Sequence, residues 1–83
     1  GVSIESSNLN LTSIYPIPTT DQLNVETNQE MTYQLLSISG KVVKSGILNV
    51  GVNPIAVSNF PNGIYFIELS NDVEKTTHKV VLR

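Results

Sequence analysis

Turn-forming residues interrupt this chain too often for an α-helix to form. Proline, glycine, asparagine, serine and threonine recur throughout the 83 residues, and no segment repeats apolar residues at the helical period of about 3.6 residues. Short runs in which apolar and polar residues alternate lie between these turn signals. The chain is therefore predicted to fold from short β-strands alone.

The strand signal recurs in seven segments: residues 9–12, 22–27, 32–38, 41–48, 53–58, 64–69 and 75–83. Strands at this spacing are typical of an all-β fold, a seven-stranded antiparallel β-sandwich of immunoglobulin-like size. The tryptophan and the paired cysteines of antibody domains are missing, which excludes that type of domain. Residues 1–8 show little periodicity and are predicted to be the end of a linker, with one domain over residues 9–83.

Glycine and proline indicate how some of these strands connect. Gly40 permits the positive φ of a tight turn, so the third and fourth segments are predicted to form a hairpin. Ser45 and Gly46 inside the fourth segment predict a β-bulge. Pro54 predicts that the fifth segment starts at a sheet edge or that a strand begins there, because proline has no N–H to donate to a neighbouring strand. The sixth segment is apolar on both faces, which predicts a central strand.

Composition excludes several classes of function. Cysteine is absent, which excludes a disulfide framework, a thiolate nucleophile and a cysteine-based metal site. The formal net charge is −2 with only five Lys and Arg residues, whereas a nucleic-acid-binding surface needs a large basic excess. No apolar run approaches the ~20 residues of a membrane-spanning helix.

The last predicted strand is basic although the chain as a whole is acidic. Before it the chain holds two lysines and seven acids, a sum of −5, whereas the strand holds three cations and no acid, a sum of +3. Side-chain alternation puts Lys75, Lys79 and Arg83 on one face. Val80 and Leu82 point to the other face. Two readings stay open: edge lysines that discourage aggregation, or a recognition tail that adds to a partner's sheet or meets an acidic groove.

Groups that could support catalysis or bind a metal are present but are not arranged for either task. His78 is the single histidine, and Ser70 and Asp72 lie near it without an elbow or a glycine-rich loop to aim them. The carboxylates considered for acid/base or metal chemistry are Glu26, Glu30, Glu68, Asp72 and Glu74. Nothing in the sequence holds two of them opposite one another, and no calcium-loop pattern is present. The chain is therefore predicted not to be an enzyme, with no catalytic residue, no metal site and no cofactor.

Four stretches resemble, in order and spacing, the C-terminal sorting domain (type A-like) of bacterial proteins exported by the type IX secretion system. They are YPIPT (15–19), YQLLSISGKVVKSG (33–46), LNVGVNPIAVSNFPNGIYFIEL (48–69) and THKVVLR (77–83). The similarity runs from about residue 9 to residue 83. Its most specific part combines a Ser-Gly-Lys hairpin, a Ser-x-x-Pro-x-Gly-x-Tyr element and a basic terminal strand. The resemblance implies a seven-stranded β-sandwich.

The resemblance also implies a secretion signal rather than a catalyst. A cargo domain N-terminal to residue 1 would cross the inner membrane into the periplasm, where the outer-membrane secretion machinery would recognise this domain. A sortase-like cysteine peptidase then typically cuts upstream of the domain, and the cargo reaches the cell surface or the extracellular space. The sequence leaves open whether the domain also associates with itself through an edge strand, and nucleic acid is not an expected partner.

The motifs of this family map onto individual residues. The structural motif residues are Pro16, Pro18, Gly40, Lys41 and Pro61, and the sorting residues are Gly63, Tyr65, Lys79, Val80, Val81, Leu82 and Arg83. Three positions depart from the pattern: Ile17 replaces a usual Asn, Ser37 a frequent Asp, and His78 a frequent second Lys. Which motif residues contact the machinery and which only support folding is left open by these departures.

A second reading, from a different class of protein, is an accessory carbohydrate- or protein-binding module of a secreted enzyme or adhesin. Such a module would use its β-sandwich to attach the protein to a glycan or to another protein. An exposed row of aromatic side chains on one sheet face would favour it. The three tyrosines and two phenylalanines of the sequence do not decide this by themselves.

Overall fold

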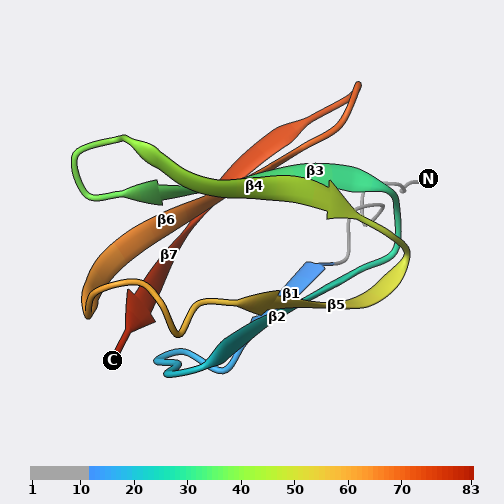
Figure 1. The fold of residues 1–83 in the computed structure, drawn as a ribbon. Coiled ribbons are helices and arrows are strands. Elements are labelled where there is room, and N and C mark those ends of the chain that lie inside the picture. Colours follow the sequence, from blue (N-terminus) through green and yellow to red (C-terminus); the bar gives the residue numbers. More distant parts are fainter. Residues whose placement is uncertain (1–11) are drawn as a thin grey trace.

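The computed structural model describes residues 12–83, which form seven β-strands and no helix. The strands are β1 (Thr12–Tyr15), β2 (Gln22–Thr27), β3 (Met31–Ser37), β4 (Val42–Leu48), β5 (Gly51–Ala56), β6 (Gly63–Ser70) and β7 (Lys75–Leu82). They make two antiparallel sheets that face one another (Figure 1). One sheet has three strands in the order β1-β2-β5, and the other has four in the order β4-β3-β6-β7. The predicted all-β, immunoglobulin-like β-sandwich is confirmed.

Most strands lie where the turn signals place them. β2 has its predicted bounds, and β6 and β7 differ from prediction by no more than one residue at either end. β5 is shifted two residues toward the N-terminus, since Gly51 already pairs with Thr27. β1 continues to Tyr15 because its last residues still pair with β2 before Pro16 follows. The predicted strand residues 9–11 and the predicted linker 1–8 lie outside the described residues.

The core lies between the two sheets and is filled by alternate residues of each strand. On β6, Tyr65, Ile67 and Leu69 all point inward, as their spacing predicted. The buried hydrophobic side chains are Leu23, Val25, Met31, Tyr33, Leu35, Leu48, Ile55, Val57, Tyr65, Ile67, Leu69, Val80 and Leu82. Both sheets contribute to this single cluster, so the two layers depend on each other for burial.

The predicted β-bulge at Ser45 and Gly46 is wrong, because the bulge of β4 lies at Val43. The register between β3 and β4 shifts there, since Lys44 and Val42 pair with consecutive residues of β3. Val43 is therefore the extra residue, and its side chain packs against the core. The bulge therefore lets the extra residue, Val43, keep its apolar side chain in contact with the core.

Gly46 does not form a bulge, and its lack of a side chain allows the Tyr33 ring to pack against it. It pairs with Tyr33 on the neighbouring strand, and a Cβ atom at Gly46 would lie 3.2 Å from the Tyr33 ring. The missing side chain leaves room for this ring on the inner face of the sheet. Burial of the ring raises the pKa of the Tyr33 hydroxyl above its usual value.

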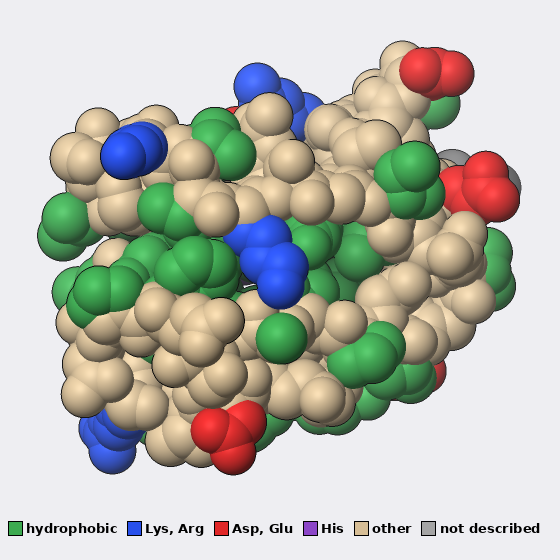
Figure 2. All heavy atoms as spheres, in the orientation of Figure 1, with side chains coloured by type: hydrophobic (Ala, Val, Ile, Leu, Met, Phe, Trp, Pro, Cys, Tyr) green, Lys and Arg blue, Asp and Glu red, His purple; other side chains and the backbone are tan. Residues whose placement is uncertain are grey.

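The edge strands β4 and β5 lie on the side of the sandwich that faces the viewer in Figure 1. Pro54 lies on the edge strand β5, one of the two positions predicted for it. Figure 2 shows hydrophobic side chains between the two layers on this side. The Lys44 Nζ atom on β4 donates a hydrogen bond to the carbonyl oxygen of Ala56 on β5, at 2.9 Å. This contact connects the two layers where no backbone hydrogen bonds join them.

The Asn53 side chain supports the crossover from β4 to β5. Its Oδ1 atom accepts the Asn49 N–H at 2.9 Å, and its Nδ2 atom donates to the Asn49 carbonyl oxygen at 2.8 Å. The same Nδ2 lies 3.2 Å from the carbonyl oxygens of Gly51 and Val25. One amide side chain thus satisfies backbone groups in the turn and in β2. Gly51 has a φ of 113°, which favours glycine at this turn.

The connection from β1 to β2 reaches across to the other sheet. Pro16 and Pro18 follow β1, both after cis peptide bonds, and Thr19 then forms a parallel bridge with the end of β7. The Thr19 N–H donates to the Val81 carbonyl oxygen at 3.0 Å, and the Arg83 N–H donates to the Thr19 carbonyl oxygen at 2.8 Å. The C-terminal end of β7 is therefore paired on both sides, by β6 and by Thr19.

Candidate recognition surface

β7 divides the predicted sorting residues between the two faces of its sheet. Val80 is fully buried in the core and Leu82 is only 2% exposed, so neither is accessible to a partner. Alternation puts Lys79, Val81 and Arg83 on the outer face, where the two cations are exposed and Val81 is half-buried. Only alternate residues of the terminal motif can therefore be contacted while the domain stays folded.

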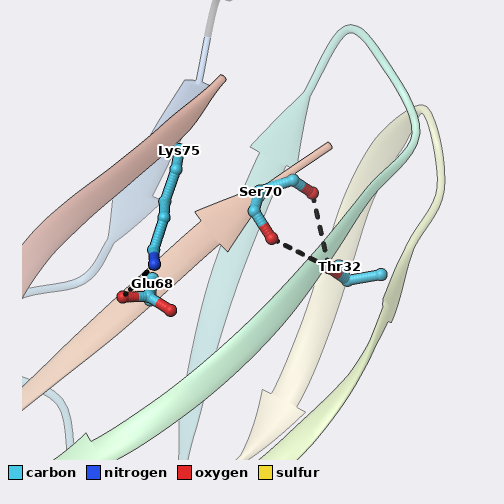
Figure 3. A network of polar contacts seen from close by, with 4 residues as sticks. All are labelled: Thr32, Glu68, Ser70 and Lys75. Carbon is cyan, nitrogen blue, oxygen red and sulfur yellow. Dashed lines mark hydrogen bonds and ion pairs between the residues drawn. The ribbon is translucent and has the colours of Figure 1, made fainter. Parts of the chain in front are cut away.

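The outer face of the four-stranded sheet is polar at one end, where β7 begins (Figure 3). The Lys75 Nζ atom lies 3.6 Å from a carboxylate oxygen of Glu68. The Thr32 Oγ1 atom lies 3.1 Å from the Ser70 Oγ atom and 3.4 Å from the Ser70 carbonyl oxygen. Lys75 thus has a carboxylate partner, and polar side chains occupy this end of the face on β3, β6 and β7, while Ile47 on β4 is exposed there.

The other end of the same face, where β7 ends, is apolar. Leu36 pairs with both Val42 and Phe66, and Ile64 pairs with Val81. Val42 is 44% exposed and Ile64 is 39% exposed, while the other three are half-buried. We call these five residues the outer patch. The sequence correctly predicted a central strand from the two apolar faces of β6, but in the described part of the chain no second layer covers the outer one.

Tyr65 and the motif residues just before it make contacts that stabilise the turn leading into β6. The Tyr65 hydroxyl donates a hydrogen bond to the Pro61 carbonyl oxygen at 2.8 Å, and its ring lies in the core beside Phe60, with ring centroids 6.3 Å apart. A tyrosine that bonds to backbone a few residues upstream is typical of immunoglobulin-like sandwiches. Gly63 has a φ of 152°, which favours glycine as the turn enters β6. These residues shape the turn before β6.

The β3–β4 hairpin has its predicted glycine turn. Gly40 has a φ of 90°, and its N–H donates to the Ser37 carbonyl oxygen at 2.9 Å. The Ser37 N–H donates to the Lys41 carbonyl oxygen at 2.8 Å, and the Ser37 Oγ atom accepts the Lys41 N–H at 3.3 Å. Ser37 therefore supplies an acceptor oxygen where the family often has an aspartate. The tip of this hairpin and the C-terminus lie at the same end of the molecule (Figure 1).

The residues considered for catalysis are not brought together. The His78 Nε2 atom lies 3.1 Å from the Thr76 Oγ1 atom, Ser70 bonds to Thr32, and Asp72 is exposed in the β6–β7 turn. Within residues 12–83 no group of three or more His, Cys, Asp and Glu side chains could hold a metal ion.

Two further observations concern the surface. Tyr15 is the only aromatic residue among the large hydrophobic side chains exposed in the described part, so no row of exposed aromatics marks a glycan-binding face there. No helix formed by residues 12–83 is long and apolar enough to span a membrane.

Fold and surface together define an immunoglobulin-like β-sandwich whose chemically distinctive part is the outer face of a basic terminal strand. Residues 13–83 match the family described as the secretion system C-terminal sorting domain. The chain therefore belongs to this family, and it is a C-terminal sorting signal for type IX secretion that directs an attached protein to the cell surface or the extracellular space. No curated protein matches the chain.

Proposed function

We propose that the secretion machinery contacts the outward-facing residues of the terminal motif, Lys79, Val81 and Arg83, while the other motif residues support folding. The alternating burial of β7 carries this proposal, because within residues 79–83 it leaves only these side chains accessible. Val80 and Leu82 fill the core, and the Gly63 and Tyr65 region shapes a turn. The predicted sorting residues thus serve two different purposes.

We also propose the remaining steps of the pathway, which the resemblance to this family supports. The cargo lies N-terminal to this domain, passes through the periplasm, and is separated from the domain by a sortase-like cysteine peptidase that cuts upstream of it. In this sequence of events the domain is recognised and removed, and it performs no chemistry itself. That the chain is not an enzyme stays a prediction. Its substrate role requires only that the folded sandwich be recognised.

Deleting residues 79–83 is the obvious test, but it would not separate recognition from folding. The deletion removes the buried side chains of Val80 and Leu82 and the backbone partners of Thr19. A truncated domain is therefore expected to unfold, and loss of export would then follow from loss of structure.

Point variants on the outer face avoid this problem. In an exporting bacterium, a cargo fused to the domain with Lys79→Ala and Arg83→Ala should reach the cell surface or medium about tenfold less than the unchanged fusion, because exposed contacts to the machinery are lost. Lys75→Ala is the matched control, since it removes a cation of the same strand and face at the polar end. The unfolding midpoints of both variants should stay near that of the parent. Unchanged export of the double variant would contradict the proposal.

The sequence leaves self-association through an edge strand open, and the charges on β7 bear on it. Thr19 already pairs with the end of this edge, which leaves the first part of β7 for another strand. In an antiparallel pair of two copies centred on Thr77, Lys75 of each copy would lie opposite Lys79 of the other. Like charges directly opposite one another destabilise a strand pair. Self-association through β7 is therefore expected to be weak, and sedimentation at increasing protein concentration measures it.

A further inference from the structure

The outer patch is apolar although the rest of the same sheet face is mostly polar, so its position on the sheet does not explain its composition. All four strands of the sheet contribute to it, through the pairs that join Leu36 to Val42 and Phe66, and Ile64 to Val81. Residues directly opposite one another on one face have Cβ atoms ~4.5–5.5 Å apart, so these side chains form one contiguous surface. Apart from Ile47, the same face is polar a few residues further along the strands, where Thr32, Gln34, Ser45 and Thr77 are exposed.

Two cations of the terminal motif border this patch. Lys79 lies opposite Phe66, and Arg83 follows Val81 by two residues on the same face. Glu68 follows Phe66 by two residues on this face, and its carboxylate is paired with Lys75 at 3.6 Å. A binding partner that matches this surface has an apolar centre with carboxylates at its rim.

We propose that the outer patch and the cations Lys79 and Arg83 form one composite docking surface for an acidic-rimmed apolar site on the outer-membrane secretion machinery. The inference rests on the proposed function and extends the contact from β7 to β3 and β4. A second copy of the chain is a poor occupant, because a two-fold contact of this surface with itself would bring Lys79 and Arg83 of both copies into one interface.

The composite surface exists only in the folded domain. Leu36 and Val42 lie far from β7 in the sequence and reach it only through the order of strands in the sheet. A terminal peptide would carry Lys79, Val81 and Arg83 but not the rest of the surface. The proposal therefore differs from recognition of a linear tail, in which β3 and β4 take no part.

A matched set of substitutions on one face tests the proposal in the cargo fusion. Val42→Asn and Ile64→Asn replace exposed apolar side chains of the patch, and together they should lower export by about tenfold. Ile47→Asn is the control, because Ile47 also lies on β4 and on the outer face but at the polar end, and it is 73% exposed. The control should change export less than about twofold. Unfolding midpoints measured on all variants should agree, since none of the three positions lies in the core.

The outcomes separate this inference from the proposed function. Normal export of the Val42 and Ile64 double variant, together with loss of export in the Lys79 and Arg83 double variant, would overturn the composite surface and leave linear-tail recognition. Normal export of both would overturn the proposed function as well. If Ile64→Asn abolishes dimers of the chain, the patch binds a second copy. If Ile64→Asn shifts the unfolding midpoint of the fused cargo, the patch binds the cargo. Either result would overturn the machinery as the occupant of the patch.

Discussion

Asn53 shows how a single side chain can take the place of a strand pairing. The turn between β4 and β5 leaves one sheet and enters the other, so the backbone of Asn49 has no neighbouring strand to bond to in the way that a sheet residue has. The Asn53 amide bonds to both polar backbone groups of Asn49 and to two further carbonyl oxygens. An amide is suited to this task because it carries both an acceptor and two donors.

Replacing Asn53 by Ala should lower the free energy of unfolding by about 2 kcal/mol, because several backbone groups lose their partner at once. Urea denaturation of the purified chain measures the change. Asn49→Ala is the matched control: its backbone, and not its side chain, makes the contacts with Asn53, so its free energy of unfolding should stay within about 0.5 kcal/mol of the parent. Equal effects of the two substitutions would show that the amide network does not support the crossover.

At the scale of the element, β7 combines two tasks by side-chain alternation. Its inward residues complete the core, whereas its outward residues carry the charge of the terminal motif. A strand is the simplest element that can do both, because successive side chains point to opposite faces. The alternation was visible in the sequence, and the structure buries Val80 and Leu82 on the face opposite to the cations.

Leu82→Ala should therefore destabilise the domain by about 2–5 kcal/mol, because a fully packed side chain would leave a cavity behind. A small domain of this size has a total stability of only about 4–12 kcal/mol, so a large share would be lost. Lys79→Ala on the outward face should change the stability by less than about 0.5 kcal/mol. Thermal and urea unfolding of the two variants compares them, and similar losses would mean that the two faces of β7 are not energetically distinct.

At the scale of the whole molecule, Thr19 connects the loop between β1 and β2 to the end of β7. The segment that joins two strands of the smaller sheet also pairs with the last strand of the larger one. It covers part of an edge that would otherwise be open to another strand. The sandwich is thus held by its shared core and, at this end, by backbone hydrogen bonds between the layers.

Hydrogen exchange of the folded chain tests this contact directly. The amides of Thr19 and Arg83 should exchange at least about tenfold more slowly than the amide of Thr20, because each donates to a backbone carbonyl across the contact. Thr20 lies in the same loop, and its amide makes no backbone hydrogen bond of this kind within residues 12–83. Equally fast exchange of the three amides would show that the end of β7 is open in solution.

The number and approximate positions of the strands could be predicted from the sequence, because period-two alternation and turn residues act locally, and the family followed from motifs spread over most of the chain. Three other features depend on pairing between distant segments and needed the folded structure. It moved the bulge to Val43, since the register of β3 and β4 sets which residue is extra. It brought Thr19 to the end of β7. It also left Ile64 and Phe66 on a face that no second layer covers within residues 12–83, because local alternation cannot show whether a layer lies over a strand.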